Sequence, residues 1–263
     1  MSGIFYALVG TAFTFLVTTL GAVNVFFVKK KVNQDIQCLF LGFAGGVMIA
    51  ASIWSLLVPG IEKAKENHQI SWLVVSCGFL LGVLLLLAVD RFMNRRLNQL
   101  QENGKEFPLS KRTMMLLTAI TIHNIPEGMA IGMAFALATD GQSGVGVMSG
   151  AIALAIGIGI QNYPEGMAVT LPLLREGISK KRAFLVGSLS AAVEPVFGVI
   201  AAALAGSIGV IMPLFLAFAA GTMIYVVVEE LIPEAHLGER ENIGTLGFVV
   251  GFLIMMILDV ALG

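Results

Sequence analysis

Long apolar runs joined by short polar connections most strongly constrain how this chain can fold. Eight such runs cover approximately residues 4–28, 36–60, 70–92, 114–138, 145–174, 183–207, 208–233 and 243–262. A transmembrane helix needs about 20 predominantly apolar residues, and each run reaches that length. Only 13% of the residues are charged, roughly half the share found in soluble domains. The sequence therefore predicts an all-α membrane protein with eight transmembrane helices in a single domain covering residues 1–263.

Basic residues gather in alternate connections, which predicts how the helices are oriented. Fourteen of the sixteen Lys and Arg residues fall in the first, third, fifth and seventh connections, and only Lys63 and Lys65 fall elsewhere. Because the cytoplasmic loops of membrane proteins are enriched in Lys and Arg, both termini are expected outside the cytoplasm. The net charge of −1 gives no support to nucleic-acid binding, which depends on basic residues that neutralise phosphates.

A duplicated eight-residue motif lies inside the fourth and fifth apolar runs. The first copy is His123-Asn124-Ile125-Pro126-Glu127-Gly128-Met129-Ala130, and the second is Gln161-Asn162-Tyr163-Pro164-Glu165-Gly166-Met167-Ala168. Six of the eight positions are identical, and the copies are 38 residues apart. Residues four apart share one helical face, so His123 pairs with Glu127 and Gln161 with Glu165. At 1.5 Å per residue these side chains lie about 15–18 Å from the nearest charged helix end, near the bilayer midplane.

Two carboxylates at this depth need a partner. Burying one in the membrane costs at least about 2.5 kcal/mol, and two on neighbouring helices repel each other. Since the fourth and fifth runs contain no Lys or Arg, a divalent cation between Glu127 and Glu165 is the simplest way to neutralise both. Imidazole, carboxylate and amide oxygen suit a borderline ion such as zinc or ferrous iron. The alternative is that the carboxyl groups are protonated and serve as structural hydrogen-bond donors.

The two prolines of the motif open the backbone beside these side chains. Pro126 removes the hydrogen bond to the carbonyl of Ile122, and Pro164 removes the one to the carbonyl of Ile160. Opened backbone is tolerated at membrane depth where it lines a cavity. Because the connection over 139–144 is short, the two helices are expected to run antiparallel. The duplicated motif is then inverted, an arrangement that many secondary transporters use for a midplane site.

Further acidic residues occur in or near the other apolar runs. Glu194 lies near the middle of the sixth run and is expected to bind or bridge a metal ion, with a structural hydrogen bond as the alternative. Glu229 and Glu230 lie near the cytoplasmic end of the seventh run and are expected on an exit pathway, with ordinary solvated helix-end charges as the alternative. Glu62 and Asp259 fall at the outer ends of the second and eighth runs and are expected to be solvated, with attraction of cations as the alternative.

The two motifs, their depth and their spacing closely resemble the fourth and fifth helices of the ZIP (Zrt/Irt-like) metal transporters. Gln161 in place of a second His resembles the GufA-like branch of that family. The resemblance extends over essentially the whole chain and implies an inverted-repeat (3+2+3) arrangement of eight helices with a two-metal centre. By resemblance, one ion would be held by His123, Glu127, Gln161 and Glu165. A second would be held with help from Asn124, Asn162 and Glu194, with Glu127 and Glu165 bridging the two ions.

The resemblance and the predicted orientation imply a transporter that moves a divalent metal ion into the cytoplasm. Zinc is expected first, with iron, manganese or cadmium as alternatives, and no prosthetic group is expected. An intramembrane metallohydrolase is a second hypothesis, but the sequence lacks a His-Glu-x-x-His pair. A transporter or channel for a harder ion such as magnesium is a third, and His123 disfavours it because such ions prefer oxygen ligands alone. The protein is expected in the lipid bilayer of a bacterial inner membrane. The sequence leaves the oligomeric state open, and a homodimer is one alternative.

Overall fold

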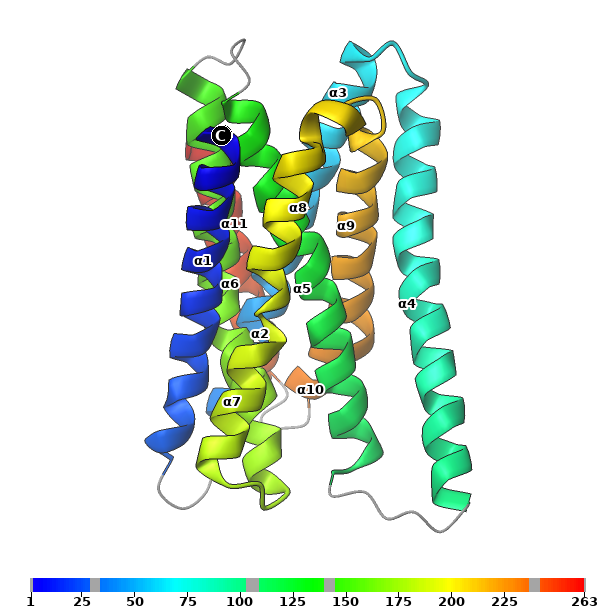
Figure 1. The fold of residues 1–263 in the computed structure, drawn as a ribbon. Coiled ribbons are helices and arrows are strands. Elements are labelled where there is room, and N and C mark those ends of the chain that lie inside the picture. The colour runs from blue at the N-terminus through cyan, green and yellow to red at the C-terminus, as the bar shows by residue number, and fades with distance from the viewer. Residues whose placement is uncertain (1, 29–33, 103–108, 140–144, 237–241, 263) are drawn as a thin grey trace.

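The computed structural model describes residues 2–28, 34–102, 109–139, 145–236 and 242–262, nearly all of them helical. The α-helices are α1 (Ser2–Val23), α2 (Gln34–Ala51), α3 (Val58–Glu66), α4 (Ser71–Glu102), α5 (Lys111–Ala138), α6 (Val145–Arg175), α7 (Lys180–Ser190), α8 (Val193–Ile208), α9 (Met212–Val226), α10 (Ile232–Ala235) and α11 (Asn242–Leu262). Three short segments complete the list: η1 (Asn24–Phe26), η2 (Ser52–Leu57) and η3 (Val227–Leu231). The long helices lie side by side in one elongated bundle (Figure 1).

Six stretches of the described chain are long and apolar enough to cross a membrane. They are Gly3–Phe26, Gln34–Glu66, Ser71–Gln99, Lys180–Ala205, Met212–Ala235 and Asn242–Ala261. Their outer faces are apolar, since the side chains of Leu16, Leu84 and Ile257 are 57%, 54% and 58% exposed. Lipid is the medium in which such surfaces are stable, because large exposed apolar areas are rare in soluble proteins. The expectation of an all-α membrane protein is confirmed at this level.

The helices that carry the duplicated motif, α5 and α6, lie inside the bundle. Helix α5 packs against α1, α6, α8 and α9, and helix α6 packs against α1, α2, α5 and α11. Their apolar side chains form much of the buried core, with Ile120 and Ile131 of α5 and Ile158 and Val169 of α6 fully buried. The polar residues of the motifs are therefore surrounded by protein and not by lipid.

The helix expected over 183–207 is interrupted between α7 and α8. Pro195 has no N–H to bond the carbonyl of Ala191, and its ring crowds that carbonyl. The backbone N–H of Glu194 takes over and donates to the Ala191 oxygen at 3.0 Å. In a regular helix this N–H would reach Ser190. The break leaves the Ser190 carbonyl open to a side chain from another helix.

Prolines also mark two places where the helical turn widens. Segments η2 and η3 are π-helical, and each leads into a short helix with proline at its second position, Pro59 in α3 and Pro233 in α10. Widened turns are frequent at functional sites, and here proline's missing N–H accounts for the change in bonding. Pro213 similarly occupies the second position of α9, so that helix begins at Met212 and not at 208.

Helix α4 extends about ten residues past the apolar run at 70–92 from which it was expected. Its last turns, Arg91–Glu102, consist largely of Arg, Asn, Gln and Leu. Arg, Gln and Leu are good helix formers in water. Apolar length measures the part of a helix that lies in lipid, and a helix continues into water where its residues permit.

Candidate metal centre

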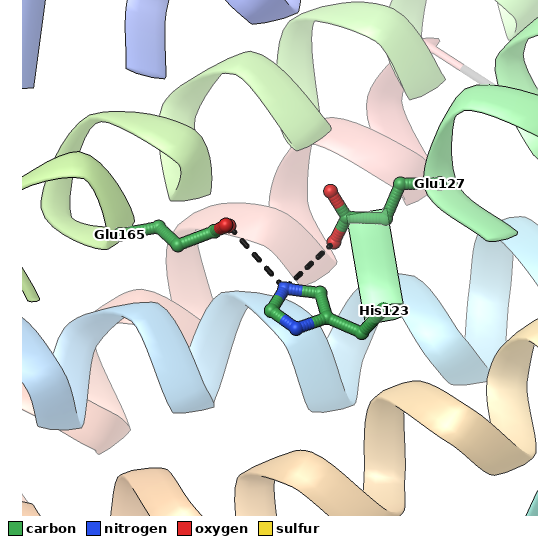
Figure 2. Close-up of side chains that lie close together, drawn as sticks. All are labelled: His123, Glu127 and Glu165. Atoms are coloured by element: carbon green, nitrogen blue, oxygen red, sulfur yellow. Dashed lines mark ion pairs between the residues drawn. The ribbon is translucent and has the colours of Figure 1, made fainter. Parts of the chain in front are cut away.

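Three side chains with metal-binding atoms meet where α5 faces α6. His123 and Glu127 lie one turn apart on α5, and Glu165 comes from α6 (Figure 2). The His123 Nε2 atom lies 3.4 Å from a Glu165 carboxylate oxygen and 3.9 Å from a Glu127 oxygen. The ligand atoms of these residues all lie within 4.8 Å of one another. Among the described residues, they form the one group of three or more His, Cys, Asp and Glu side chains with this property.

The side chains of this centre are buried, and several of their atoms have no hydrogen-bond partner. His123 and Glu127 are 0% exposed and Glu165 is 2% exposed. His123 Nε2, Glu127 Oε2 and both carboxylate oxygens of Glu165 lack a hydrogen-bond partner. The other ring nitrogen of His123, Nδ1, lies 3.2 Å from the Ala119 carbonyl oxygen. That contact favours a hydrogen on Nδ1, which leaves Nε2 as a lone-pair donor.

Gln161 completes the first set of residues that the sequence predicted. It lies one turn before Glu165 on α6, is 0% exposed, and its amide nitrogen donates a hydrogen bond to Glu127 Oε1. Its carbonyl oxygen, Oε1, is buried without a partner. The predicted facing of the two motifs is thus present in the structure, and Gln161 links them by a direct contact between α6 and α5.

The second predicted set lies beside the first but is held by hydrogen bonds. Asn162 donates its amide N–H groups to both oxygens of Glu194, at 3.0 and 3.1 Å. Asn124 donates to the Ser190 carbonyl at 3.2 Å, the group left open by the break between α7 and α8. Glu194 is fully buried.

Sequence reasoning missed one residue of this second group. The hydroxyl of Thr14, in the middle of α1, donates to Glu194 Oε2. Threonines in a membrane helix usually bond the carbonyl three or four residues earlier, as Thr11 does to Ala7 at 2.7 Å. A threonine in an apolar run therefore does not indicate from sequence whether its hydroxyl bonds its own helix or a side chain on another helix. The motif spacing carried no information about α1.

Glycines next to the two glutamates bring their helices close to neighbours. A Cβ atom on Gly128 would collide with the backbone of Glu194 in α8, and one on Gly166 would collide with the backbone of Thr18 in α1. Only a residue without a side chain permits such backbone approach. The glycines thus fix how near α8 and α1 come to Glu127 and Glu165.

A cavity of about 530 Å³ leads from one end of the bundle toward this centre. Its lining includes the exposed residues Glu62 and Val147, and also Ala130 and Met133 on α5, one to two turns beyond Glu127. Asp259 also lines it, and there Ser55 donates a hydrogen bond of 2.6 Å to its carboxylate. Asp259 was expected to be a solvated helix end, whereas one of its oxygens is buried without a partner.

The two glutamates of the predicted exit pathway lie outside the buried group. Glu229 and Glu230 belong to η3, where Glu229 is exposed and Glu230 is partly buried. Nearby, the hydroxyl of Tyr225 donates to the Asp90 carboxylate at 2.5 Å, which joins α9 to α4. These acidic groups gather at the end of the bundle opposite the cavity.

The start of α5 is joined to the end of α6 by another carboxylate. Glu176 accepts hydrogen bonds from the backbone and hydroxyl of Ser110, which caps α5, and from the hydroxyl of Thr113. Partial burial opposes ionisation of Glu176, but these hydrogen bonds outweigh it and lower its pKa below the usual 4.5. The two motif helices are thus connected outside the apolar region as well as inside it.

The fold and the buried centre define a helical membrane protein with a buried group of potential metal-binding side chains between two of its helices. Comparison with known proteins agrees with this class. Residues 99–259 match the family model described as ZIP Zinc transporter. The chain is 34% identical over 340 residues to Zinc transporter ZIP11 of Homo sapiens, covering 100% of this chain and 98% of that protein.

Bacterial relatives give the same result. Identity to Zinc transporter ZIPB of Bordetella bronchiseptica is 36% over 261 residues, covering 98% of this chain and 82% of the relative. Identity to Zinc transporter GufA of Myxococcus xanthus is 34% over 262 residues, covering 97% and 96%. The chain belongs to the ZIP zinc transporter family, as the sequence motifs predicted. Since this is a family of transporters, the expectation that the chain is not an enzyme is confirmed.

Proposed function

We propose that this protein carries divalent metal ions into the cytoplasm, with Zn²⁺ as the main substrate and Fe²⁺, Mn²⁺ or Cd²⁺ as alternatives. One observation carries the proposal. The six motif residues His123, Asn124, Glu127, Gln161, Asn162 and Glu165 have seven buried nitrogen and oxygen atoms without a hydrogen-bond partner. A buried polar atom left unsatisfied costs about 1–3 kcal/mol. Since all seven are lone-pair donors, a cation satisfies several of them at once.

The first ion is proposed to bind His123, Glu127, Gln161 and Glu165. Zinc accepts imidazole nitrogen and carboxylate oxygen in the same site, and His123 argues against a site for Mg²⁺ or Ca²⁺. Asn124, Asn162 and Glu194 form the adjoining set proposed for a second ion. In the structure the Asn162 nitrogen faces Glu194. A second ion therefore requires that amide to turn, and the first set is the resting transport site.

The path is proposed to begin at the cavity lined by Ser55, Glu62 and Asp259 and to end at Glu229 and Glu230. The cavity reaches α5 one turn beyond Glu127. The exit glutamates lie at the other end of the bundle and are partly exposed. The ion would thus approach from the cavity side and leave past the acidic end.

The cavity side is proposed to face outward, as the charge distribution indicates. The described basic residues include Arg91, Arg95 and Arg96 in the last turns of α4 and Lys180, Lys181 and Arg182 in the first turn of α7. The end of α4 and the start of α7 lie at the lower end of the bundle in Figure 1. The other basic residues of the odd-numbered connections include Lys29–Lys31, Lys105 and Arg240, which lie outside the described residues. Helix α1 begins and α11 ends at the upper end (Figure 1). Positive-inside orientation then leaves both termini outside, and we propose a bacterial inner membrane.

We propose that the fold contains eight membrane-spanning helical segments, some of them made of two or three labelled helices, in an inverted 3+2+3 repeat. Under this scheme α1, α2 and α4 correspond to α7–α8, α9 and α11, while α5 corresponds to α6. The pattern of packing supports it: α1 pairs with α6 as α8 does with α5, and α2 pairs with α11 as α9 does with α4. The π-helical turns also support the inverted repeat. Segment η2 follows α2 and segment η3 follows α9, the helix that corresponds to α2, and each lies shortly before a proline.

Zinc uptake into proteoliposomes tests the proposed function. Glu127→Ala and Glu165→Ala are each expected to abolish uptake while the protein keeps its elution volume and helical circular dichroism. Glu66→Ala is the matched control, because that exposed carboxylate pairs with Lys63 on the surface. Normal zinc uptake by both centre variants would overturn the proposal. Excess Mg²⁺ should not compete, and if it did, the preference for a borderline ion would be wrong.

A further inference from the structure

Glu194 is buried beside the metal centre, and protein hydrogen bonds occupy both of its carboxylate oxygens. Oε1 accepts from Asn162, while Oε2 accepts from Asn162 and from the hydroxyl of Thr14. Glu165, by contrast, has both oxygens without a partner. Hydrogen bonds to an ionised carboxylate are about twice as strong as those between neutral groups. These hydrogen bonds already stabilise negative charge on Glu194 and occupy three of its roughly four lone-pair sites, so a cation gains less by binding it than by binding Glu165.

Thr14 is aimed at this carboxylate from a third helix. It is fully buried in α1, and its single hydroxyl hydrogen has a choice of two acceptors, Glu194 Oε2 and the Thr11 carbonyl at 3.0 Å. The carboxylate is the stronger acceptor because it is charged. The same turn of α1 also accepts from Asn162, whose nitrogen lies 3.5 Å from the Thr14 carbonyl.

The contacts of Asn162 fix which way its amide faces. All of its described hydrogen-bond partners are acceptors, namely the two oxygens of Glu194 and the carbonyl of Thr14. The nitrogen must therefore point at Glu194, and the amide oxygen points away from it and is buried without a partner. In this orientation Asn162 offers Glu194 hydrogens and cannot offer an ion between them an oxygen.

We propose that Thr14 is a positioning residue that, together with Asn162, holds Glu194 out of metal coordination and so limits the centre to one ion. The inference rests on the proposed function and adds to it the control of ion number by α1. Removing the Thr14 hydroxyl frees a lone pair on the buried Glu194, and replacing Asn162 by Asp turns a donor into a second carboxylate. Each change makes a second cation at this position more favourable.

The test is zinc stoichiometry of the full-length detergent-purified protein, measured by equilibrium dialysis and elemental analysis. The unchanged protein is expected to bind one Zn²⁺ tightly. Thr14→Val should tighten binding of a second Zn²⁺ at least about tenfold, the effect of one charge-assisted hydrogen bond, and Asn162→Asp should bind two tightly. Thr14→Ser keeps the hydroxyl and should match the unchanged protein.

Thr18→Val is the matched control, because Thr18 is equally buried on the same face of α1 and its hydroxyl donates to the Thr14 carbonyl of its own helix, at 3.2 Å. It should bind one ion. Two tightly bound ions in the unchanged protein would overturn this inference and leave the proposed function standing. So would equal behaviour of Thr14→Val and Thr14→Ser. Failure of every form to bind zinc would instead overturn the proposed function, and this inference with it.

Discussion

Glu165 and Glu194 lie in the same buried region, yet the protein treats the two carboxylates differently. Glu165 faces His123 at 3.4 Å, and neither of its oxygens receives a hydrogen bond. Glu194 receives hydrogen bonds from two residues on two other helices. A buried acid is stabilised either by fixed donors or by a cation. The comparison separates the two acids: both are buried, but only Glu165 lacks donors on both oxygens, which makes it the better candidate for a metal ligand.

The largest expected effect separates the two carboxylates directly. Glu165→Gln is expected to weaken zinc binding by at least a hundredfold, about 2.7 kcal/mol, because it removes a charged ligand. Glu194→Gln is expected to weaken it less than tenfold. Isothermal titration with Zn²⁺ measures both. Equal losses in the two variants would break the distinction between the acids.

The second-largest loss of zinc affinity is expected when the imidazole of His123 is removed. His123→Leu substitutes an apolar side chain of similar size and removes the imidazole, the source of the only nitrogen ligand in the group of His123, Glu127 and Glu165. Zinc binding should weaken by more than tenfold, and the preference for zinc over Mg²⁺ should fall because oxygen ligands alone remain. Uptake assays with competing Mg²⁺ detect the change in preference. Unaltered selectivity would contradict the role given to His123.

A smaller effect is expected from the spacing between α5 and α8. Gly128→Ala places a Cβ atom against the backbone of Glu194, which cannot withdraw without moving the helix. Overpacking of this kind typically costs about 1–3 kcal/mol, so the melting temperature should fall. Gly150→Ala is the matched control, since nothing lies within 4 Å of a Cβ there. If both variants melted alike, the close approach would not be a constraint.

The smallest effect is expected at Glu176, outside the membrane-spanning segments. Because its pKa is lowered in the folded protein, its stabilising contribution is full above its unfolded pKa and is lost as the pH falls through its lowered, folded pKa. The unchanged protein should therefore lose its advantage over Glu176→Gln as the pH falls below about 4.5. Thermal unfolding at a series of pH values measures this. A constant difference between the two proteins from pH 7 to 3 would refute it.

The sequence predicted the parts of the molecule that follow from periodicity and repetition. The i, i+4 spacing of His123 and Glu127, repeated by Gln161 and Glu165, was enough to predict that these side chains meet. The break before Glu194 was not predicted, although Pro195 gave a usable signal through its clash with the residue four earlier. The widened turns before Pro59 and Pro233 had the same kind of signal.

The partner of Glu194 had no signal in the sequence. Thr14 lies in a run with three other threonines, Thr11, Thr18 and Thr19, and each of these bonds its own helix backbone. Which of them faces α8 depends on the rotation of α1, which is set by packing against Gly166 and Gly198. Long-range hydrogen bonds of this kind become visible only when the helices have been placed in space.

Anomalous diffraction from crystals grown with Zn²⁺ tests the central claim most directly. The account predicts one strong peak between His123, Glu127 and Glu165, at zinc-ligand distances of about 2.0–2.2 Å, with Glu194 still bonded to Thr14 and Asn162. A peak on Glu194 with no ion at His123, or Glu165 turned toward lipid, would contradict it.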